Sequence, residues 1–355
     1  MKTPIRKTRA WLAALLLWVL LPGVAVAREI VLLSWEDYVA PELLAQFTKA
    51  TGTKVRVVTF EDDGERDKLL VAANAGDFDL ICVNHTALGA YRGSGWLAPV
   101  GMAEVPNLRH MDRRWFERVP EADGYGVPYF WGTTGIAYRK DLVDRELQHW
   151  KDLLEPTPGL AGAIAMTTNA RDLTGVALKA LGYSVNSSDP VQLKEAEALL
   201  LKQRPAVRNY NYELAVEREK SALITGQIKA ALAFNGDALQ LQALEPRVVY
   251  VVPAEGTSLW IDFLVVAAQS TRKADAFALL DFLNQPEVAA RNARHVNFAS
   301  PNKAAQALLP PAFLGNPAIY PPASVLEHAE FEQELPPRAQ KRVNELVARV
   351  LRVPK

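Results

Sequence analysis

Cysteine is almost absent from this 355-residue sequence, and the single one, Cys82, excludes a disulfide within the chain. Cys82 lies in the apolar run 79–83, where a cysteine usually acts as a small apolar side chain. A nucleophilic role is disfavoured because His85, three residues away, has no evident residue to orient it. We therefore expect Cys82 to be a core residue.

Metal-site and enzyme motifs are missing as well. The five histidines are scattered, and no pair has the spacing of metal ligands. The sequence contains no GxxxxGKS/T, GxGxxG, GxSxG or HExxH pattern. Paired acids such as Asp37 and Asp237 are the residue types of general acid–base catalysis. Without a nucleophile, metal site or cofactor motif, however, we predict no enzyme, no cofactor and no metal.

A basic surface is also lacking. The formal net charge is zero, with 40 basic and 40 acidic residues. Four of the basic residues lie in the first 27 positions, which contain no acid, so the rest of the chain has 36 basic residues against 40 acidic ones. A nucleic-acid-binding protein usually shows an excess of positive charge. We therefore expect no nucleic-acid partner.

Long hydrophobic runs are absent except near the N-terminus, where Trp11 to Leu21 is apolar. Basic residues precede this run, and Pro22-Gly23 and the small-residue pattern Ala25-Val26-Ala27 follow it, which is the organisation of a secretory signal peptide. A membrane anchor is the alternative, but the run is short for a span of about 20 residues. We predict that residues 1–27 are removed by cleavage and that the protein is periplasmic, without a membrane span.

The chain from residue 28 onward alternates strand and helix patterns. The first elements are a buried strand at 29–33, an amphipathic helix at 41–50 with Gly52 as its cap, and an alternating strand at 54–60. A second helix at 65–75 and a second buried strand at 79–83 follow. Short connections between such elements predict an α/β fold with parallel, doubly wound sheets. Further on we expect helices at 191–202, 220–227 and 275–284 and strands at 228–234, 248–252 and 261–267.

Aromatic residues and acids recur together at the ends of the predicted strands. A single instance is more often structural, since Asp37, for example, can cap the helix that begins near Pro41. Because open α/β sheets bind ligands at the carboxyl ends of their strands, four instances favour a common site. Carboxylates next to aromatic faces suit an organic cation with an apolar body. The residues are Trp35, Asp37, Tyr38, Asp172, Phe234, Asp237, Trp260, Asp262 and Phe298.

Asn84 ends the third predicted strand, close to the expected level of Trp35 and Tyr38. Polar residues at this position either terminate the strand and cap the next helix or donate hydrogen bonds to a ligand. The residues alone leave both possibilities open.

From residue 29 almost to the C-terminus, the sequence resembles the periplasmic polyamine-binding proteins of ABC transporters, the spermidine/putrescine-binding group. The segments that carry the resemblance are Ser34-Trp35-Glu36-Asp37-Tyr38-Val39-Ala40-Pro41, Phe78-Asp79-Leu80, Pro128-Tyr129-Phe130-Trp131-Gly132-Thr133-Thr134-Gly135, Phe234-Asn235-Gly236-Asp237, Glu255-Gly256 with Leu259-Trp260-Ile261-Asp262, and Asn302-Lys303-Ala304-Ala305. The run Asn316-Pro317-Ala318-Ile319-Tyr320-Pro321-Pro322 is more similar to the putrescine-binding branch.

The resemblance implies a periplasmic-binding-protein fold of the type II kind, with two α/β lobes and the ligand cleft between them. We expect lobe 1 to comprise residues 28–135 and 261–300, and lobe 2 to comprise residues 136–260, with residues 301–355 packing mainly on lobe 2. The resemblance also implies that the ligand cleft has aromatic walls, formed by Trp35, Tyr38, Phe234, Trp260 and Phe298. The ammonium partners would be Asp37, Asp172, Asp237 and Asp262, and Asn84 stands where the family often has a ligand-binding serine.

Three departures from the family pattern bear on the ligand. Phe234 stands where the family often has Trp, Phe298 where it often has Tyr, and Asn169 at a position that can be acidic in spermidine binders. Losing an acid disfavours a third ammonium group, which tilts the expectation toward putrescine or a similar diamine. The expected role is capture of a polyamine by a monomer for delivery to an inner-membrane ABC permease. A periplasmic subunit that reports polyamine binding to a membrane sensor is the alternative.

Overall fold

The computed structural model describes residues 28–73, 75–210 and 220–352, so the expected signal peptide at 1–27 lies outside the described residues. Its first five elements are β1 (Arg28–Ser34), α1 (Pro41–Thr51), β2 (Thr53–Thr59), α2 (Asp63–Ala73) and β3 (Leu80–Asn84). This is the predicted order, and α1 ends at Gly52, whose φ of 74° gives the expected left-handed cap. In the described part of the chain, no helix is both long and apolar enough to cross a membrane.

The strands lie in the order β2-β1-β3-β9-β4-β7-β5-β6, with β10 beside β9 and β8 beside β4. The other strands are β4 (Gly126–Arg139), β5 (Ile164–Ala165), β6 (Val207–Asn209), β7 (Ala230–Phe234), β8 (Val248–Val251), β9 (Ser258–Val266) and β10 (Glu330–Phe331). The outer strands pair in parallel, but β9 is antiparallel to β3 and β4, and β4 is antiparallel to β7 and β8. The sheets are therefore mixed, and our expectation of mainly parallel sheets was wrong for the central strands.

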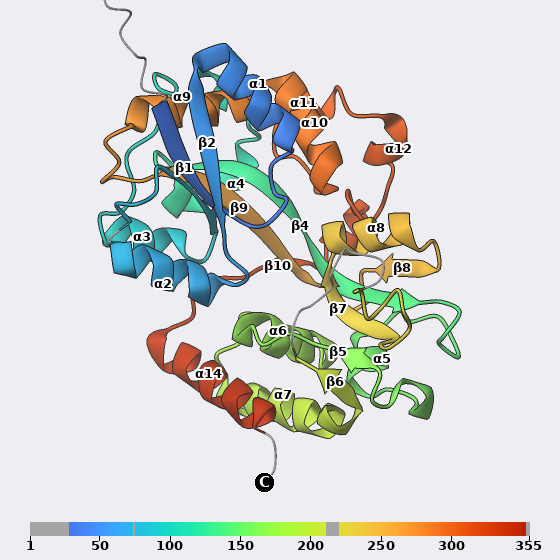
Figure 1. Cartoon of the computed structure of the whole chain (residues 1–355). Helices are drawn as coiled ribbons and strands as arrows, with labels where there is room; N and C mark the ends of the chain where they lie inside the picture. The colour runs from blue at the N-terminus through green and yellow to red at the C-terminus, as the bar shows by residue number, and fades with distance from the viewer. Residues whose placement is uncertain (1–27, 74, 211–219, 353–355) are drawn as a thin grey trace, which may run out of the picture.

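Helices cover both faces of the lobe 1 sheet (Figure 1). One face packs against α1, α9 (Lys273–Leu283) and α10 (Pro286–Val296), and the other against α2, α3 (Leu88–Gly93) and α4 (Arg114–Arg118). Each face has its own buried apolar cluster, which is why the intervening strands are apolar on both sides. This is the expected α/β architecture of a doubly wound lobe.

Lobe 2 is built around the second half of β4. Its larger apolar cluster includes residues of α5 (Trp150–Leu154), α6 (Ala170–Ala180), α7 (Pro190–Gln203) and α14 (Pro337–Leu351), and its smaller one includes residues of α8 (Asn235–Leu244). β4 joins the two lobes, because residues 126–133 pair with β9 of lobe 1 and residues 134–138 pair with β7 of lobe 2. The division expected at residue 135 falls close to this change of partner, whereas the one expected at 260 falls inside β9.

The C-terminal segment is shared between the lobes, although we expected it to pack mainly on lobe 2. Ala305, Leu309 and Ile319 belong to the apolar clusters of lobe 1, together with the stretch that contains α11 (Lys303–Gln306), α12 (Pro311–Leu314) and α13 (Ala323–Leu326). The part that lies on lobe 2 is α14, which Figure 1 shows beside α6 and α7, together with Leu335 just before it and Glu330, which bonds to Lys179. The expectation therefore describes α14 but not residues 303–320.

One predicted helix is also absent. Residues 220–227 form a succession of turns rather than a helix. Gly226 has a φ of 76°, which an α-helix does not accommodate, and the Thr225 hydroxyl donates to the Ser221 carbonyl oxygen at 2.8 Å. Local turn chemistry thus outweighs the helical pattern in this stretch.

Candidate functional site

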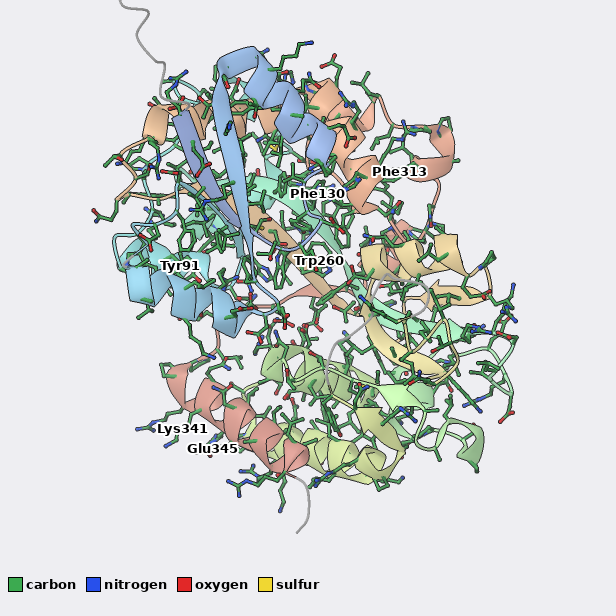
Figure 2. All side chains as sticks on the ribbon, viewed as in Figure 1. Tyr91, Phe130, Trp260, Phe313, Lys341 and Glu345 are labelled. Atoms are coloured by element: carbon green, nitrogen blue, oxygen red, sulfur yellow. The ribbon has the colours of Figure 1, made fainter. Side chains whose placement is uncertain are left out.

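Four of the predicted aromatic residues form a continuous row where the two lobes meet. The ring centroids of Phe234 and Trp260 are 6.0 Å apart, those of Trp260 and Phe298 4.8 Å, and those of Phe298 and Tyr38 5.8 Å, all edge to face. Figure 2 places Trp260 centrally, between the upper and lower groups of elements. The row therefore runs from the end of β7 in lobe 2 to the loop after β1 in lobe 1.

A glycine lets the lobe 2 helix α8 approach this row. A Cβ atom on Gly236 would lie 2.2 Å from the Phe298 ring, which is far too close for any side chain. Phe298 itself is 6% exposed and packs in the lobe 1 core. The Gly in the Phe234-Asn235-Gly236-Asp237 segment is thus required by close packing across the two lobes.

Asp262 is the acid most closely enclosed by the aromatic row. It is 6% exposed, and the Tyr38 hydroxyl donates to its Oδ2 at 2.8 Å. Burial raises the pKa of Asp262 to about 7, although hydrogen bonds from Tyr38 and Trp35 act in the opposite direction. Among the described residues, Asp262 has no salt-bridge partner. A buried carboxylate without a cation is costly, so this group favours a positively charged guest.

Asn84 lies directly opposite Asp262 in the antiparallel β3–β9 ladder. Its Nδ2 donates to Asp63 Oδ2 at 2.8 Å, and its Oδ1 accepts from the Thr86 hydroxyl and from the Ala87 backbone N–H. The Asn84 side chain therefore ends the strand by bonding to the turn before α3, the first of the two roles considered. Its amide nitrogen is directed to Asp63, an acid that we had not predicted.

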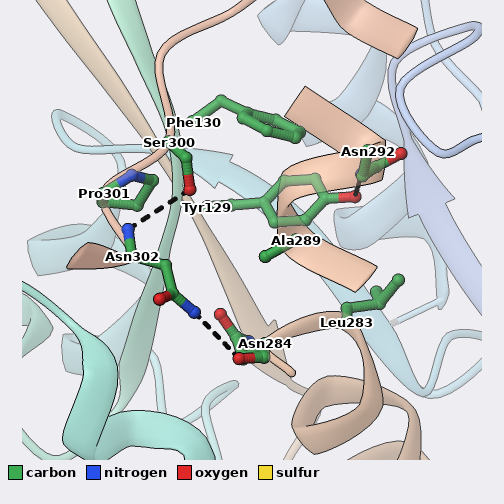
Figure 3. Close-up of a pocket in the computed structure, with 9 residues that line it drawn as sticks. All are labelled: Tyr129, Phe130, Leu283, Asn284, Ala289, Asn292, Ser300, Pro301 and Asn302. Carbon is green, nitrogen blue, oxygen red and sulfur yellow. Dashed lines mark hydrogen bonds between the residues drawn. The ribbon is translucent and has the colours of Figure 1, made fainter. Parts of the chain in front are cut away.

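A hydrogen-bond network behind the aromatic row holds Tyr38 in position, and Figure 3 shows its link between Tyr129 and Asn292. The Tyr129 hydroxyl donates to the Tyr38 carbonyl oxygen at 3.1 Å and accepts from Asn292 Nδ2 at 2.7 Å. Asn292 Oδ1 also accepts from the Ala40 N–H at 2.9 Å. The cavity beside Tyr129 and Asn292 has a volume of about 10 Å³, which is room for at most one water. It therefore belongs to the support of the site and cannot hold an organic ligand.

On the lobe 2 side, Asp172 is half-buried in the first turn of α6. Desolvation, followed by the negative charges of Glu332 and Asp63, raises the pKa of Asp172 well above its ordinary value, while Arg171 lowers it. Glu332 Oε2 lies 3.7 Å from Arg171 Nε, and its buried Oε1 has no hydrogen-bond partner among the described residues. Acids of both lobes thus lie close enough together to raise the pKa of Asp172, and Arg171 offsets only part of their negative charge.

The two remaining predicted acids each follow the carboxyl end of a strand, Asp37 after β1 and Asp237 after β7, but their surroundings differ. Asp237 is half-buried in the first turn of α8. Burial raises the pKa of Tyr250, the negative charge of Asp237 raises it further, and the Tyr250 hydroxyl donates to the Thr133 carbonyl oxygen at 2.9 Å. Asp37 is exposed and adopts a left-handed φ of 52°, between Trp35 and Tyr38. The structure therefore joins Tyr38, Asp262, Phe298, Trp260 and Phe234 by direct contact. Trp35 packs on Phe60 and against the same core cluster, and Asp37 stays outside the group.

Sequence reasoning missed Asp63, Arg66 and Glu332. Asp63 and Arg66 lie in a run of charged residues at 61–68, which looks like a solvent-exposed helix start. Arg66 is nevertheless 1% exposed and binds Asp63 at 2.6 Å. An arginine flanked by acids at positions i−3 and i+1 was the available signal. Cys82, by contrast, is a buried core residue as predicted, and burial raises the pKa of its thiol well above the ordinary value.

Known proteins with similar sequences and structures share this architecture. A sequence model described as bacterial extracellular solute-binding protein matches residues 42–321. The spermidine/putrescine-binding periplasmic protein of Escherichia coli is 30% identical over 85% of this chain and 86% of that protein. The norspermidine sensor of Vibrio cholerae is 30% identical over 88% of this chain and 85% of that protein.

Among solved structures, the spermidine/putrescine ABC transporter substrate-binding protein PotD from Streptococcus pneumoniae, in complex with calcium and HEPES, is similar with a TM-score of 0.78. The two are 28% identical, and the match covers 91% of this chain and 98% of PotD. The two-lobed fold inferred from the sequence is thereby confirmed. These names do not separate a diamine binder from a binder of longer polyamines, so the putrescine branch stays a prediction. The chain belongs to the family of bacterial extracellular solute-binding proteins, which is not a family of enzymes.

Proposed function

We propose that this protein is a periplasmic solute-binding protein that captures a polyamine between its lobes and delivers it to an inner-membrane ABC permease. The observation that carries the proposal is Asp262, a carboxylate that is almost fully buried among aromatic rings and lacks a cation. An ammonium group of the ligand would supply the missing charge. Relatives named for spermidine and putrescine support the same ligand class.

The row of aromatic rings would pack the methylene chain of the ligand. Aromatic faces attract ammonium groups by about 0.5–2 kcal/mol each, so the row would contribute affinity as well as shape. Acids at both ends of the row, Asp262 in lobe 1 and Asp172 and Asp237 in lobe 2, fit a ligand with two separated charges.

A diamine is the favoured ligand within this class. By the family resemblance, Asn169 stands at a position that can be acidic in spermidine binders. Its Oδ1 accepts from the Arg171 and Asp172 N–H groups as the cap of α6. Asn169 is therefore committed to the helix start. The remaining acids suit two ammonium groups better than three.

Ligand capture would draw the lobes together, because the contributing residues come from both. The acids of lobe 2 and lobe 1 repel one another without a cation, and a polyamine would turn that repulsion into attraction. Secretion by cleavage after Ala27, a periplasmic location and a monomeric state are parts of the same proposal. N-terminal sequencing and size-exclusion chromatography of the secreted protein test them.

Isothermal titration calorimetry on the purified protein tests the function. The protein is first unfolded and refolded, so that a tightly bound ligand is removed. Putrescine, cadaverine, spermidine and an amino acid are then titrated in turn. Saturable binding of an amine, with none for the amino acid, is the expected result. No heat with any amine would contradict the proposal.

A sensing role is the second candidate, because the Vibrio cholerae relative is a norspermidine sensor. The binding site would be the same, and only the outer surface that contacts the membrane partner would differ. Co-purification from membranes distinguishes the two: a permease supports transport, and a membrane sensor supports signalling.

A further inference from the structure

Arg66 is a fully buried cation in the wall of lobe 1, close to the candidate site. It is 1% exposed and is among the largest fully buried side chains of the molecule. Its Nη1 binds Asp63 at 2.6 Å, its Nη2 binds Asp67 at 3.0 Å and its Nε donates to the Tyr91 hydroxyl at 2.8 Å. The guanidinium also lies 5.7 Å from the Phe60 ring centroid. Four groups therefore fix the position of this charge.

A chain of direct contacts links Arg66 to the acid at the centre of the site. Asp63 binds Arg66 through Oδ1 and accepts from Asn84 through Oδ2. Asn84 is the register partner of Asp262 across β3 and β9. Both charges also act on Asp262 through space. Burial is the main cause of its raised pKa; the negative charge of Asp63 raises the pKa further and the positive charge of Arg66 lowers it.

This arrangement is unnecessary for packing alone. An apolar side chain of similar length would fill the space between Phe60 and Tyr91 without the desolvation cost of a buried cation. The buried pair instead adds a fixed positive and a fixed negative charge near Asp262, with the negative charge on the side of Asn84. Compared with a site that had Asp63 but not Arg66, this site presents less negative charge to a ligand.

We infer that Arg66, by offsetting the charge of Asp63, is a specificity-determining residue that biases the site toward ligands with two ammonium groups over ligands with three. The inference rests on the proposed function and adds the source of charge selectivity. Each ammonium group of a bound ligand experiences the field of Arg66, so a triamine is penalised once more than a diamine. The charge of Arg66 acts on the ligand through space, against the opposite charge of Asp63, and Arg66 need not touch the ligand.

The test measures dissociation constants for putrescine and spermidine at pH 7.5 by calorimetry, and takes their ratio. For Arg66→Met we expect the ratio to shift toward spermidine by about threefold to tenfold, the size of one charge interaction at moderate dielectric. For Asp63→Asn we expect a shift of similar size toward putrescine. The double variant removes both charges, and its ratio should return close to that of the wild type.

Two controls separate charge from structure. Arg66→Lys keeps the charge but loses the forked geometry, so its ratio should stay within twofold of the wild type even where thermal unfolding shows lower stability. Arg92→Met removes an exposed arginine that lies over the Tyr125 ring of the same lobe, and solvent should screen its effect. A purely structural role would weaken both ligands equally.

The outcomes are distinguishable. An unchanged ratio in both Arg66→Met and Asp63→Asn, with amine binding retained, overturns this inference and leaves the proposed function intact. An unchanged ratio in Asp63→Asn alone suffices where Arg66→Met does not fold. Absence of amine binding in the wild type overturns the proposed function itself.

Discussion

The two ends of the β3–β9 strand pair each hold a buried acid, and the two acids are treated in opposite ways. At the amino end of β3, Asp79 is 1% exposed and accepts from the Val31 N–H at 2.8 Å and from the Ser270 hydroxyl at 2.6 Å. Arg272 completes its surroundings with a salt bridge at 3.0 Å. At the carboxyl end, Asp262 accepts a hydrogen bond from the Tyr38 hydroxyl and, among the described residues, has no salt-bridge partner.

The contrast separates an acid that builds the fold from one that is suited to a ligand. Asp79 ties β1, β3 and the loop after β9 together, and every one of its contacts comes from the protein. Asp262 has the same burial without the same compensation. Burial alone therefore does not identify a functional acid; the absence of a protein cation beside it is the informative part.

The largest expected effect is on Asp262. Asp262→Asn should lower polyamine affinity by about 100-fold or more, since a desolvated ammonium loses its charged partner. The unliganded protein should keep or gain stability, because the substitution removes an uncompensated buried charge. Calorimetry and thermal unfolding measure the two quantities. An affinity within threefold of the wild type would refute the assignment of this acid to the ligand.

Asp79→Asn should show the reverse pattern. We expect a loss of about 1–3 kcal/mol in the free energy of unfolding, because the Val31 N–H, the Ser270 hydroxyl or Arg272 loses an acceptor. Polyamine affinity should stay within twofold. Urea unfolding monitored by tryptophan fluorescence, with calorimetry on the same samples, makes the comparison. A large loss of affinity at full stability would show that the two ends of the strand pair are not functionally distinct.

The pH dependence should reveal Asp262 without a mutation. Its pKa is raised from an ordinary 3.8 to about 7, so between these values the folded state holds a proton that the unfolded chain has lost. Its contribution to unliganded stability should therefore fall as the pH rises from about 4 to about 7, by at most about 1.4 kcal/mol per unit. Polyamine affinity should rise over the upper part of this range. Asp262→Asn should make both profiles less steep, with the remaining slope coming from acids such as Asp172, whose pKa burial also raises. Profiles of unchanged slope would contradict this origin.

A smaller effect is expected from the network behind Tyr38. Asn292→Ala removes hydrogen bonds to Tyr129 and Ala40 and should weaken polyamine binding several-fold through loss of Tyr38 positioning. Asn284→Ala is the matched control, since this asparagine lines the same small cavity and bonds to the Leu280 carbonyl oxygen. Both variants should lose stability. Equal affinities for the two would show that the network supports the fold and not the site.

Much of the fold was predictable because periodicity is a local property. The order of the first five elements, their approximate bounds and the two-lobed class follow from apolar spacing, glycine stops and the family resemblance. The antiparallel placement of β9 between β3 and β4 was not predictable, because strand direction depends on pairing between segments about 180 residues apart. The division of the C-terminal segment between the lobes depends on long-range packing in the same way.

The sequence predicted which residues follow the strand ends and line the candidate site, but not the hydrogen bonds and ion pairs that connect them. Tyr38 and Asp262 were both expected, but their hydrogen bond joins positions 224 residues apart, and a sequence pattern does not express it. Arg66 was missed because a charged residue in a charged run is normally exposed. Burial of such a residue becomes evident only when Phe60 and Tyr91 are seen to enclose it.

The position of α14 has a consequence for the time course of folding. The lobe 2 core that contains Trp150 and Leu200 also contains Val343 and Leu346, from the last described helix. Lobe 1 likewise needs β9, α9 and α10 from the second half of the chain. A chain emerging from its N-terminus therefore cannot complete either core until almost all of it has been released. High sequence separation of contacts slows folding, so we expect the unfolded chain of this topology to be long-lived.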